Sequence, residues 1–436
     1  MKHIPVGANG PGQRSIPPDP NPCCVPRRIS SMNIESTRDR GAKDSAKAHG
    51  MRRRARQDHS TSVGYCPFPL DTDPEHFGIT TGSIDTSAGP VVVRHERRTT
   101  AGTATILLHG GAGSWTTWTP LLSAADSAAA EDASVTTLKD LVIPDLPGWG
   151  DTPLPPDAES LTVEVMADAI VEIARSLGYN HWIVIGHSMG GFIALQLAST
   201  DLRATTFVGL ISGTTFSVID SVRHPVARFT ELPAFTALLQ IMKVLSLFET
   251  TARRIIPSLN RMPLLRPIVA PLFSHPARVD KSVIDALATE VRARACTIAS
   301  ARTGGYNAEL AWSRIECPVR ASYGGRDVFV AETDGQRLGA VIGDFEVQSI
   351  AGSGHFGQVE RPYETLSALL GRPRPRSLLR FGLGPRIEHK IWGSRTNDSA
   401  HVVVGLREFP IPQQAPQQAD RAQPDRSKTE PALGDD

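Results

Sequence analysis

The most constraining feature of this sequence is the pentapeptide Gly186-His187-Ser188-Met189-Gly190, which fits the pattern G-x-S-x-G. It follows an apolar run at 182–185 and precedes a helical pattern that begins at Ala194. A serine on a sharp turn between a buried strand and a helix is exposed for attack, and glycines leave room for the neighbouring elements. A tight turn with an inert serine would carry the same five letters, but the flanking strand and helix favour Ser188 as a nucleophile.

A serine hydroxyl is a poor nucleophile unless a base takes its proton and a third group orients that base. For a serine on such a turn the expected chain order is Ser, then Asp or Glu, then His. Asp327 and His355 each follow an apolar run downstream of Ser188, so we predict an acid at Asp327 and a general base at His355. Asp334 and Asp344 are the alternative acids, but the first falls inside a helical pattern and the second precedes a strand.

The segment Leu-His-Gly-Gly-Ala-Gly at 108–113 follows another apolar run. Small residues there let backbone N–H groups approach the oxygen that becomes negatively charged during acyl transfer, so we predict oxyanion-hole donors at Gly111 and Met189. A phosphate-binding glycine loop is the alternative. It is disfavoured because no Lys-Ser/Thr pair follows and the G-x-G-x-x-G spacing is absent.

Three further residues near these motifs have candidate roles. Asp145 precedes Leu-Pro-Gly and is predicted to organise a turn rather than to act as a catalyst. Trp115 and His187 are candidates for the wall of a substrate pocket, although for Trp115 packing is the favoured role. No metal site and no cofactor are predicted, because no cysteine pair has the spacing of a zinc site.

Strands and helices alternate through the middle of the chain. One amphipathic helix is expected over 161–177, with Ser160 as its N-cap and Gly178 as its stop. Short, nearly continuous apolar runs are typical of strands buried on both faces of a parallel sheet. These runs lie at 91–93, 105–108, 141–143, 182–185, 207–211, 319–323 and 345–350. The alternation predicts an α/β protein with a doubly wound sheet.

The stretch 214–301 breaks this rhythm, since it carries helical apolar sequence, many prolines and no convincing strand. We predict a helical cap or lid there, between a first core part at 75–213 and a second at 302–371. The leader 1–74 and the tail 372–436 are Pro-rich and poor in apolar periodicity, so both are expected to be largely disordered, with a short edge strand at 401–406 left open.

Composition narrows the class of partner and the compartment. The net charge of +1 gives no pull toward nucleic acid. Five cysteines form no disulfide framework, no run of about 18 apolar residues is present and no apolar leader core is visible, so a cytoplasmic protein without stable membrane insertion is expected. The cap region is apolar and leans basic, which favours a lipophilic substrate and leaves docking at a membrane surface open. The oligomeric state stays open.

The chain resembles the α/β-hydrolase superfamily through motifs that occur in the expected order. They are His109-Gly110-Gly111, Asp145-Leu146-Pro147-Gly148-Trp149-Gly150, Gly186-His187-Ser188-Met189-Gly190-Gly191, Gly325-Arg326-Asp327 and Gly354-His355. The resemblance implies an eight-stranded, mostly parallel sheet with a helical cap after the sixth strand, and catalysis through an acyl-serine intermediate. Epoxide hydrolases and haloalkane dehalogenases are similar too, but they have an aspartate where this chain has Ser188.

The expected function is therefore a serine hydrolase that cleaves a carboxylic ester or related acyl bond of a small-molecule acyl substrate. Two alternatives stay open at the level of sequence. An acyltransferase would use the same acyl-enzyme and pass the acyl group to an alcohol or amine instead of water. A ligand receptor would keep the fold and the triad without turnover, and would show strong ligand-dependent stabilisation.

Overall fold

The computed structural model of the chain describes residues 64–96, 102–132, 138–226, 232–262 and 264–371. Most of the predicted leader, the predicted tail 372–436 and the short apolar stretch 401–406 lie outside the described residues. The described residues do include 64–74, which the sequence assigned to the leader. Tyr65 and Leu70 in that segment are buried in a hydrophobic cluster.

The described residues form an eight-stranded sheet with the strand order β1-β2-β4-β3-β5-β6-β7-β8. The strands are β1 (Thr80–Thr86), β2 (Gly89–His95), β3 (Thr103–Leu108), β4 (Leu141–Pro144), β5 (His181–His187), β6 (Thr205–Ile211), β7 (Val319–Gly324) and β8 (Phe345–Ile350). β1 pairs antiparallel with β2, and β2 pairs antiparallel with β4, whereas β4, β3 and β5 to β8 are mutually parallel. The predicted eight-stranded, mostly parallel sheet is confirmed.

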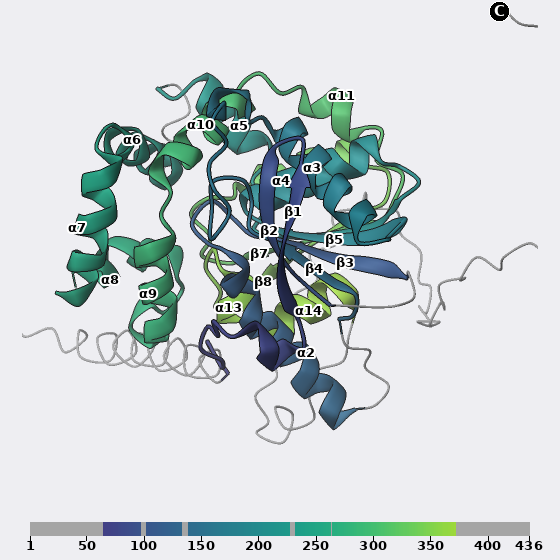
Figure 1. Cartoon of the computed structure of the whole chain (residues 1–436), viewed down its shortest axis with the longest axis horizontal. Coiled ribbons are helices and arrows are strands. Elements are labelled where there is room, and N and C mark those ends of the chain that lie inside the picture. Colours follow the sequence, from purple (N-terminus) through teal and green to yellow (C-terminus); the bar gives the residue numbers. More distant parts are fainter. Residues whose placement is uncertain (1–63, 97–101, 133–137, 227–231, 263, 372–436) are drawn as a thin grey trace, which may run out of the picture. The chain divides into compact units, whose positions relative to one another are not determined.

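The sheet is buried on both faces because its central strands send alternate apolar side chains to two separate hydrophobic clusters. On β3, Ile106 and Leu108 join one cluster, whereas Leu107 joins the other. The first cluster is completed by α3 (Val163–Ser176), α4 (Met189–Thr200) and α12 (Glu332–Val341), and the second by α2 (Thr119–Glu131) and α14 (Pro362–Leu370). Figure 1 shows these helices around the sheet.

The helix predicted over 161–177 is α3, but its N-cap differs from the prediction. The side chain of Thr162 accepts a hydrogen bond from the N–H of Val165 and caps the helix. Ser160 instead lies in the 3₁₀ turn η3 (Ala158–Ser160), where its hydroxyl donates to the carbonyl of Asp157. Serine and threonine are both favourable N-cap residues, so residue type alone does not decide between them. Here Ser160 belongs to the preceding turn, and Thr162 begins the helix. Gly178 has a φ of 89° and ends the helix as predicted.

The chain between β6 and β7 contains only helices among its described residues. They are α5 (Phe216–Arg223), α6 (Pro233–Leu247), α7 (Glu249–Arg261), α8 (Leu265–Val269), η4 (Ala270–Leu272), η5 (Pro276–Arg278), α9 (Lys281–Glu290), α10 (Ala293–Thr303) and α11 (Ala308–Trp312). Figure 1 shows α6 to α9 lying to one side of the sheet. The remaining short helices are η1 (Pro74–Phe77), η2 (Trp115–Trp118) and α13 (Gly357–Glu360).

Candidate active site

Ser188 lies between the end of β5 and the start of α4, in a backbone conformation that L-residues rarely adopt. Its φ of 52° and ψ of −119° make it one of four described non-glycine residues with positive φ. The turn is tight: a Cβ atom on Gly190 would lie 2.1 Å from the carbonyl oxygen of Leu108, and one on Gly186 would lie 2.3 Å from the carbonyl oxygen of Gly190. Only glycine fits these two positions, so the strained serine is held by its surroundings.

His355 and Asp327 are joined by a hydrogen bond at the same edge of the sheet. His355 Nδ1 lies 3.0 Å from Asp327 Oδ1 and 3.2 Å from Oδ2, and both side chains are almost fully buried. The carboxylate accepts the Nδ1–H, which leaves Nε2 as the basic nitrogen. Burial alone would raise the pKa of Asp327, but attraction to His355, the hydrogen bond from it and the N–H of Phe329 lower that pKa below its ordinary value.

The His355 ring is packed between aromatic neighbours. Its centroid lies 4.8 Å from that of Phe329, 4.9 Å from that of His187 and 5.6 Å from that of Phe356. The His355 ring therefore packs against His187, the residue that precedes Ser188. Among the described residues, Ser188 Oγ and His355 Nε2 are not joined by a hydrogen bond. In unliganded enzymes the distance between a nucleophile and its base is often long, and it shortens when substrate binds.

The loop after β3 lies directly against the serine. A Cβ atom on Gly110 would lie 2.9 Å from Ser188 Cβ, which places the predicted oxyanion loop beside the nucleophile. Trp149 Nε1–H donates to the carbonyl of Gly111 at 2.8 Å and holds the following Gly111–Ala112 peptide. Among the described residues, neither the Gly111 N–H nor the Met189 N–H donates a hydrogen bond, so both are free for a ligand oxygen.

Two buried histidines flank the site in neutral form. His187 Nε2–H donates to the carbonyl of His355 at 3.0 Å, and burial lowers the pKa of His187 well below its ordinary value. His109 accepts the N–H of Leu146 at Nε2, and burial lowers its pKa as well. His187 thus supports the loop of His355, and its predicted role as a pocket residue stays a prediction.

Trp115 and Asp145 lie behind the oxyanion loop. The Trp115 N–H donates to Asp145 Oδ1 at 2.9 Å, and its buried ring lies under the guanidinium of Arg94, 5.1 Å from the centroid. Asp145 forms an ion pair with Arg94 and accepts the N–H of Asp151, so it organises the turn after β4 as predicted. The role of Trp115 as a pocket residue also stays a prediction, since its ring packs into the hydrophobic cluster of α2.

The sequence did not single out Glu360, which holds the loop of His355. This fully buried carboxylate accepts the N–H groups of Gly354 at 2.9 Å and Phe356 at 3.2 Å, on either side of His355. It also accepts the hydroxyl of Tyr65 and the N–H of Ser274, both at 2.8 Å. A signal was available in the sequence, because an acid followed by Arg-Pro at the start of a helix comes five residues after the predicted base.

The helices between β6 and β7 reach the site through two contacts that the sequence did not predict. The N–H of His355 donates to the carbonyl of Leu272 at 2.8 Å, and a Cβ atom on Gly354 would lie 2.5 Å from that same oxygen. On α10, Cys296 Sγ lies 3.9 Å from the position of a Cβ atom on Gly111. The site is therefore framed by the sheet edge on one side and by this helical region on the other.

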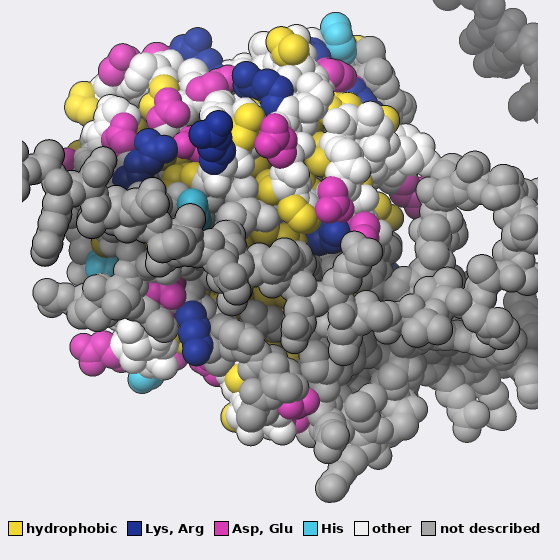
Figure 2. All heavy atoms as spheres, turned by 90° about the vertical axis from the view of Figure 1, so that its right-hand side faces the viewer, with side chains coloured by type: hydrophobic (Ala, Val, Ile, Leu, Met, Phe, Trp, Pro, Cys, Tyr) yellow, Lys and Arg dark blue, Asp and Glu magenta, His cyan; other side chains and the backbone are white. Residues whose placement is uncertain are grey.

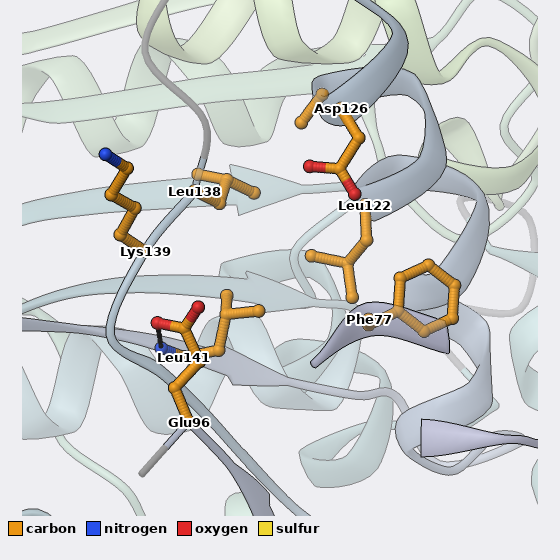
Figure 3. A pocket seen from close by; sticks show the side chains of 8 residues that line it. Phe77, Glu96, Leu122, Asp126, Leu138, Lys139 and Leu141 are labelled. Carbon is orange, nitrogen blue, oxygen red and sulfur yellow. Dashed lines mark hydrogen bonds between the residues drawn. The ribbon is translucent and has the colours of Figure 1, made fainter. Parts of the chain in front are cut away.

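A separate hollow of about 130 Å³ is lined by none of these residues and lies at the amino end of β4. Figure 3 shows its lining side chains, which come from η1, α2, the end of β2 and the chain around the start of β4. Glu96 in this hollow accepts the N–H of Leu141 at 3.3 Å. The described residues contain no cluster of ligands for a metal ion, and no described helix is long and apolar enough to cross a membrane.

The comparisons with known proteins agree with this architecture. The model of the Alpha/beta hydrolase family matches residues 105–369, and the chain belongs to this family. A segment of 98 residues is 29% identical to Bifunctional epoxide hydrolase 2 of Sus scrofa, and the match covers 22% of this chain and only 16% of that protein.

Solved structures show the same fold at low sequence identity. The crystal structure of a hydrolase from Pseudomonas aeruginosa PA01 is 16% identical with a TM-score of 0.50, and the alignment covers 67% of this chain and 99% of that one. A thermophilic esterase from Thermogutta terrifontis is 17% identical with a TM-score of 0.46, over 69% of this chain and 98% of that one. The Pseudomonas aeruginosa structure thus shares the fold of this chain.

Proposed function

We propose that this chain is a serine hydrolase that cleaves a carboxylic ester or related acyl bond of a lipophilic small molecule. One observation carries the proposal. Ser188 lies on a strained turn beside an oxyanion loop with free N–H groups, and a buried Asp327–His355 pair ends on the same edge of the sheet. Nothing in ordinary packing requires all three features to converge.

The proposed reaction starts when His355 Nε2 takes the proton of Ser188 Oγ as that oxygen attacks the substrate carbonyl. Asp327 holds the imidazole in the required tautomer and stabilises the imidazolium that forms. The N–H groups of Gly111 and Met189 donate to the oxyanion, and each such donor contributes about 10²–10³ in rate. The imidazolium then protonates the leaving alcohol or amine, and water repeats the sequence on the acyl-serine.

The proposed pocket would lie under the helices between β6 and β7, which act as a cap. The apolar side chains Phe235 and Leu239 on the inner side of α6 cluster with Phe329, which in turn contacts His355. An acyl group entering between α6 and the sheet edge would thus meet aromatic and aliphatic surface, which supports a lipophilic substrate.

Covalent labelling of the full chain with a fluorophosphonate probe tests the proposal. We expect an adduct that mass spectrometry locates on Ser188, no adduct with Ser188→Ala, and labelling slowed about 10²-fold or more with His355→Ala. Ser160→Ala is the matched control, since this exposed serine lies outside the site. A folded wild-type chain that takes no label, or labels equally without Ser188, would overturn the proposal.

The acyltransferase alternative is separated by product analysis. Wild-type protein is given an aryl ester with and without an added alcohol. Free acid as the main product in both reactions supports the hydrolase, whereas a new ester in the presence of the alcohol favours acyl transfer.

A further inference from the structure

The outer surface of the helices α6, α7 and α8 exposes large apolar side chains at helical spacing. On α6 and its end, Ile241, Val244 and Phe248 recur at steps of three and four residues, and Leu247 beside them is 76% exposed. On α7, Ile255 is half-exposed, and Met262 at its end, Leu264 just before α8 and Ile268 on α8 are exposed as well. Exposed apolar side chains gathered on one part of a protein surface indicate an interaction site.

The same helices carry a net positive charge. Residues 233–269 contain five basic residues and one acidic residue, a net charge of +4, although the whole chain has a net charge of only +1. Lys243, Arg254 and Arg261 are exposed among the apolar side chains. Figure 2 shows a different face, where the described Lys and Arg side chains are mixed with Asp and Glu.

We propose that the outer surface of α6 to α8 docks onto an anionic lipid surface. Helices that combine exposed apolar side chains with basic residues bind such surfaces by burying the apolar face and placing the cations at the headgroups. A second copy of the chain fits less well, because pairing this surface with itself would bring two clusters of positive charge together.

The surface is connected to the candidate active site through one layer of side chains. The inner side of α6 contributes Phe235, whose ring lies 6.0 Å from that of Phe329. Phe329 lies 4.8 Å from the His355 ring, and its N–H donates to Asp327. Docking would therefore place the catalytic pair directly behind the lipid-facing helix. The proposal itself concerns binding and does not require turnover.

Sedimentation with lipid vesicles tests the docking surface. The full-length chain is mixed with vesicles of phosphatidylcholine alone and of phosphatidylcholine with phosphatidylglycerol. We expect binding to the anionic vesicles at least about tenfold stronger than to the neutral ones, since each basic residue near such a surface contributes about fivefold. Raising the salt concentration should weaken binding.

Two double variants test the apolar residues and the basic residues of the surface in turn. Val244→Glu with Leu247→Glu should lower the partition coefficient about tenfold or more, and so should Lys243→Glu with Arg254→Glu. Leu310→Glu is the matched control, because Leu310 is also an exposed apolar residue but lies on α11, away from α6 to α8 in Figure 1. The control should bind within about twofold of the wild type.

All the substituted side chains are exposed, so each variant should keep its fold, and circular dichroism checks this. Equal vesicle binding by wild type and both double variants would overturn the proposal, and so would a folded wild type that does not bind anionic vesicles. A dimer in analytical ultracentrifugation that only the Val244 and Leu247 double variant disrupts would assign the surface to a second copy instead.

Discussion

At the carboxyl edge of the sheet, three glycines lie where an added methyl group would come within 2.3 Å of a backbone oxygen: Gly186, Gly190 and Gly324. On the outer side of α6 to α8, by contrast, large side chains extend into solvent and meet little of the protein. The first region is packed so closely that an added side chain would displace the backbone around Ser188. The second region leaves its apolar side chains exposed to solvent, where a binding partner can contact them. The two regions thus differ in packing: the first is closely packed, and the second exposes apolar surface.

The largest expected effect breaks the rigid side of this comparison. Gly190→Ala places a methyl group 2.1 Å from the Leu108 oxygen, and neither backbone can move without displacing Ser188. We expect a loss of about 3 kcal/mol or more in the free energy of unfolding, measured by urea denaturation. Gly343→Ala is the control, because an added Cβ there meets nothing within 4 Å, and it should change stability by less than about 0.5 kcal/mol.

A smaller effect is expected from the carboxylate that supports His355. Glu360→Gln leaves one carbonyl oxygen where four donors converge, and turns an NH₂ group toward some of them. We expect a stability loss of about 2 kcal/mol and a kcat about tenfold lower, with KM little changed, because the base is displaced rather than removed. Glu346→Gln, at an exposed site on β8, should have neither effect. A wild-type kcat for Glu360→Gln would contradict a positioning role.

The buried histidines predict a dependence of stability on pH. Folding lowers the pKa of His187. Below about pH 6.5 this side chain therefore binds a proton in the unfolded chain but not in the folded chain. Stability should therefore fall as the pH drops from 7.5 to 5.5, by about 1 kcal/mol for each such group.

His187→Gln should reduce this dependence, and His109, whose pKa is also lowered, should retain the remainder. Urea denaturation at both pH values measures the difference. The same slope in the variant and the wild type would show that His187 is not the group that titrates.

The smallest effect is expected on the outer surface of α7. Ile255→Ser removes an apolar side chain that is half-exposed, so stability should change by less than about 0.5 kcal/mol. Ile284→Ser on α9 is the contrasting substitution, because that side chain is buried and its loss should lower the free energy of unfolding by about 3 kcal/mol. Thermal unfolding of the two variants compares them. Equal losses would mean that the outer side of α7 is packed as tightly as the inner side of α9.

Sequence patterns predicted the elements that are buried on both sides. Seven of the eight strands stand at predicted places. Those inside the parallel part of the sheet, β4, β3, β5, β6 and β7, were predicted because such strands are short apolar runs, and the antiparallel β2 and the edge strand β8 were predicted as well. β1 was missed, since Thr80–Thr86 is polar, lies at the edge and has no buried residue. The N-cap of α3 was misplaced by two residues because Ser160 and Thr162 are chemically interchangeable as caps.

The candidate site was predictable where one residue does one task. The positions of Ser188, Asp327 and His355 follow from motifs at strand ends, and the structure pairs the last two, while their catalytic roles stay predictions. The supports were not predictable, because they are long-range and depend on the backbone. Glu360 accepts the hydroxyl of Tyr65, which lies 295 residues away along the chain. The contact with Leu272 is made by its backbone carbonyl, so the identity of the side chain gives no signal for it.

The bond from the His355 N–H to the carbonyl of Leu272 bears on how this protein can be recombined with its relatives. An engineer who exchanges the region between β6 and β7 for that of another member of the family also exchanges an anchor of His355. The helical region and the position of His355 are therefore inherited together. A chimera should keep Leu272 to Ser274 from this chain and join the foreign helices outside that segment.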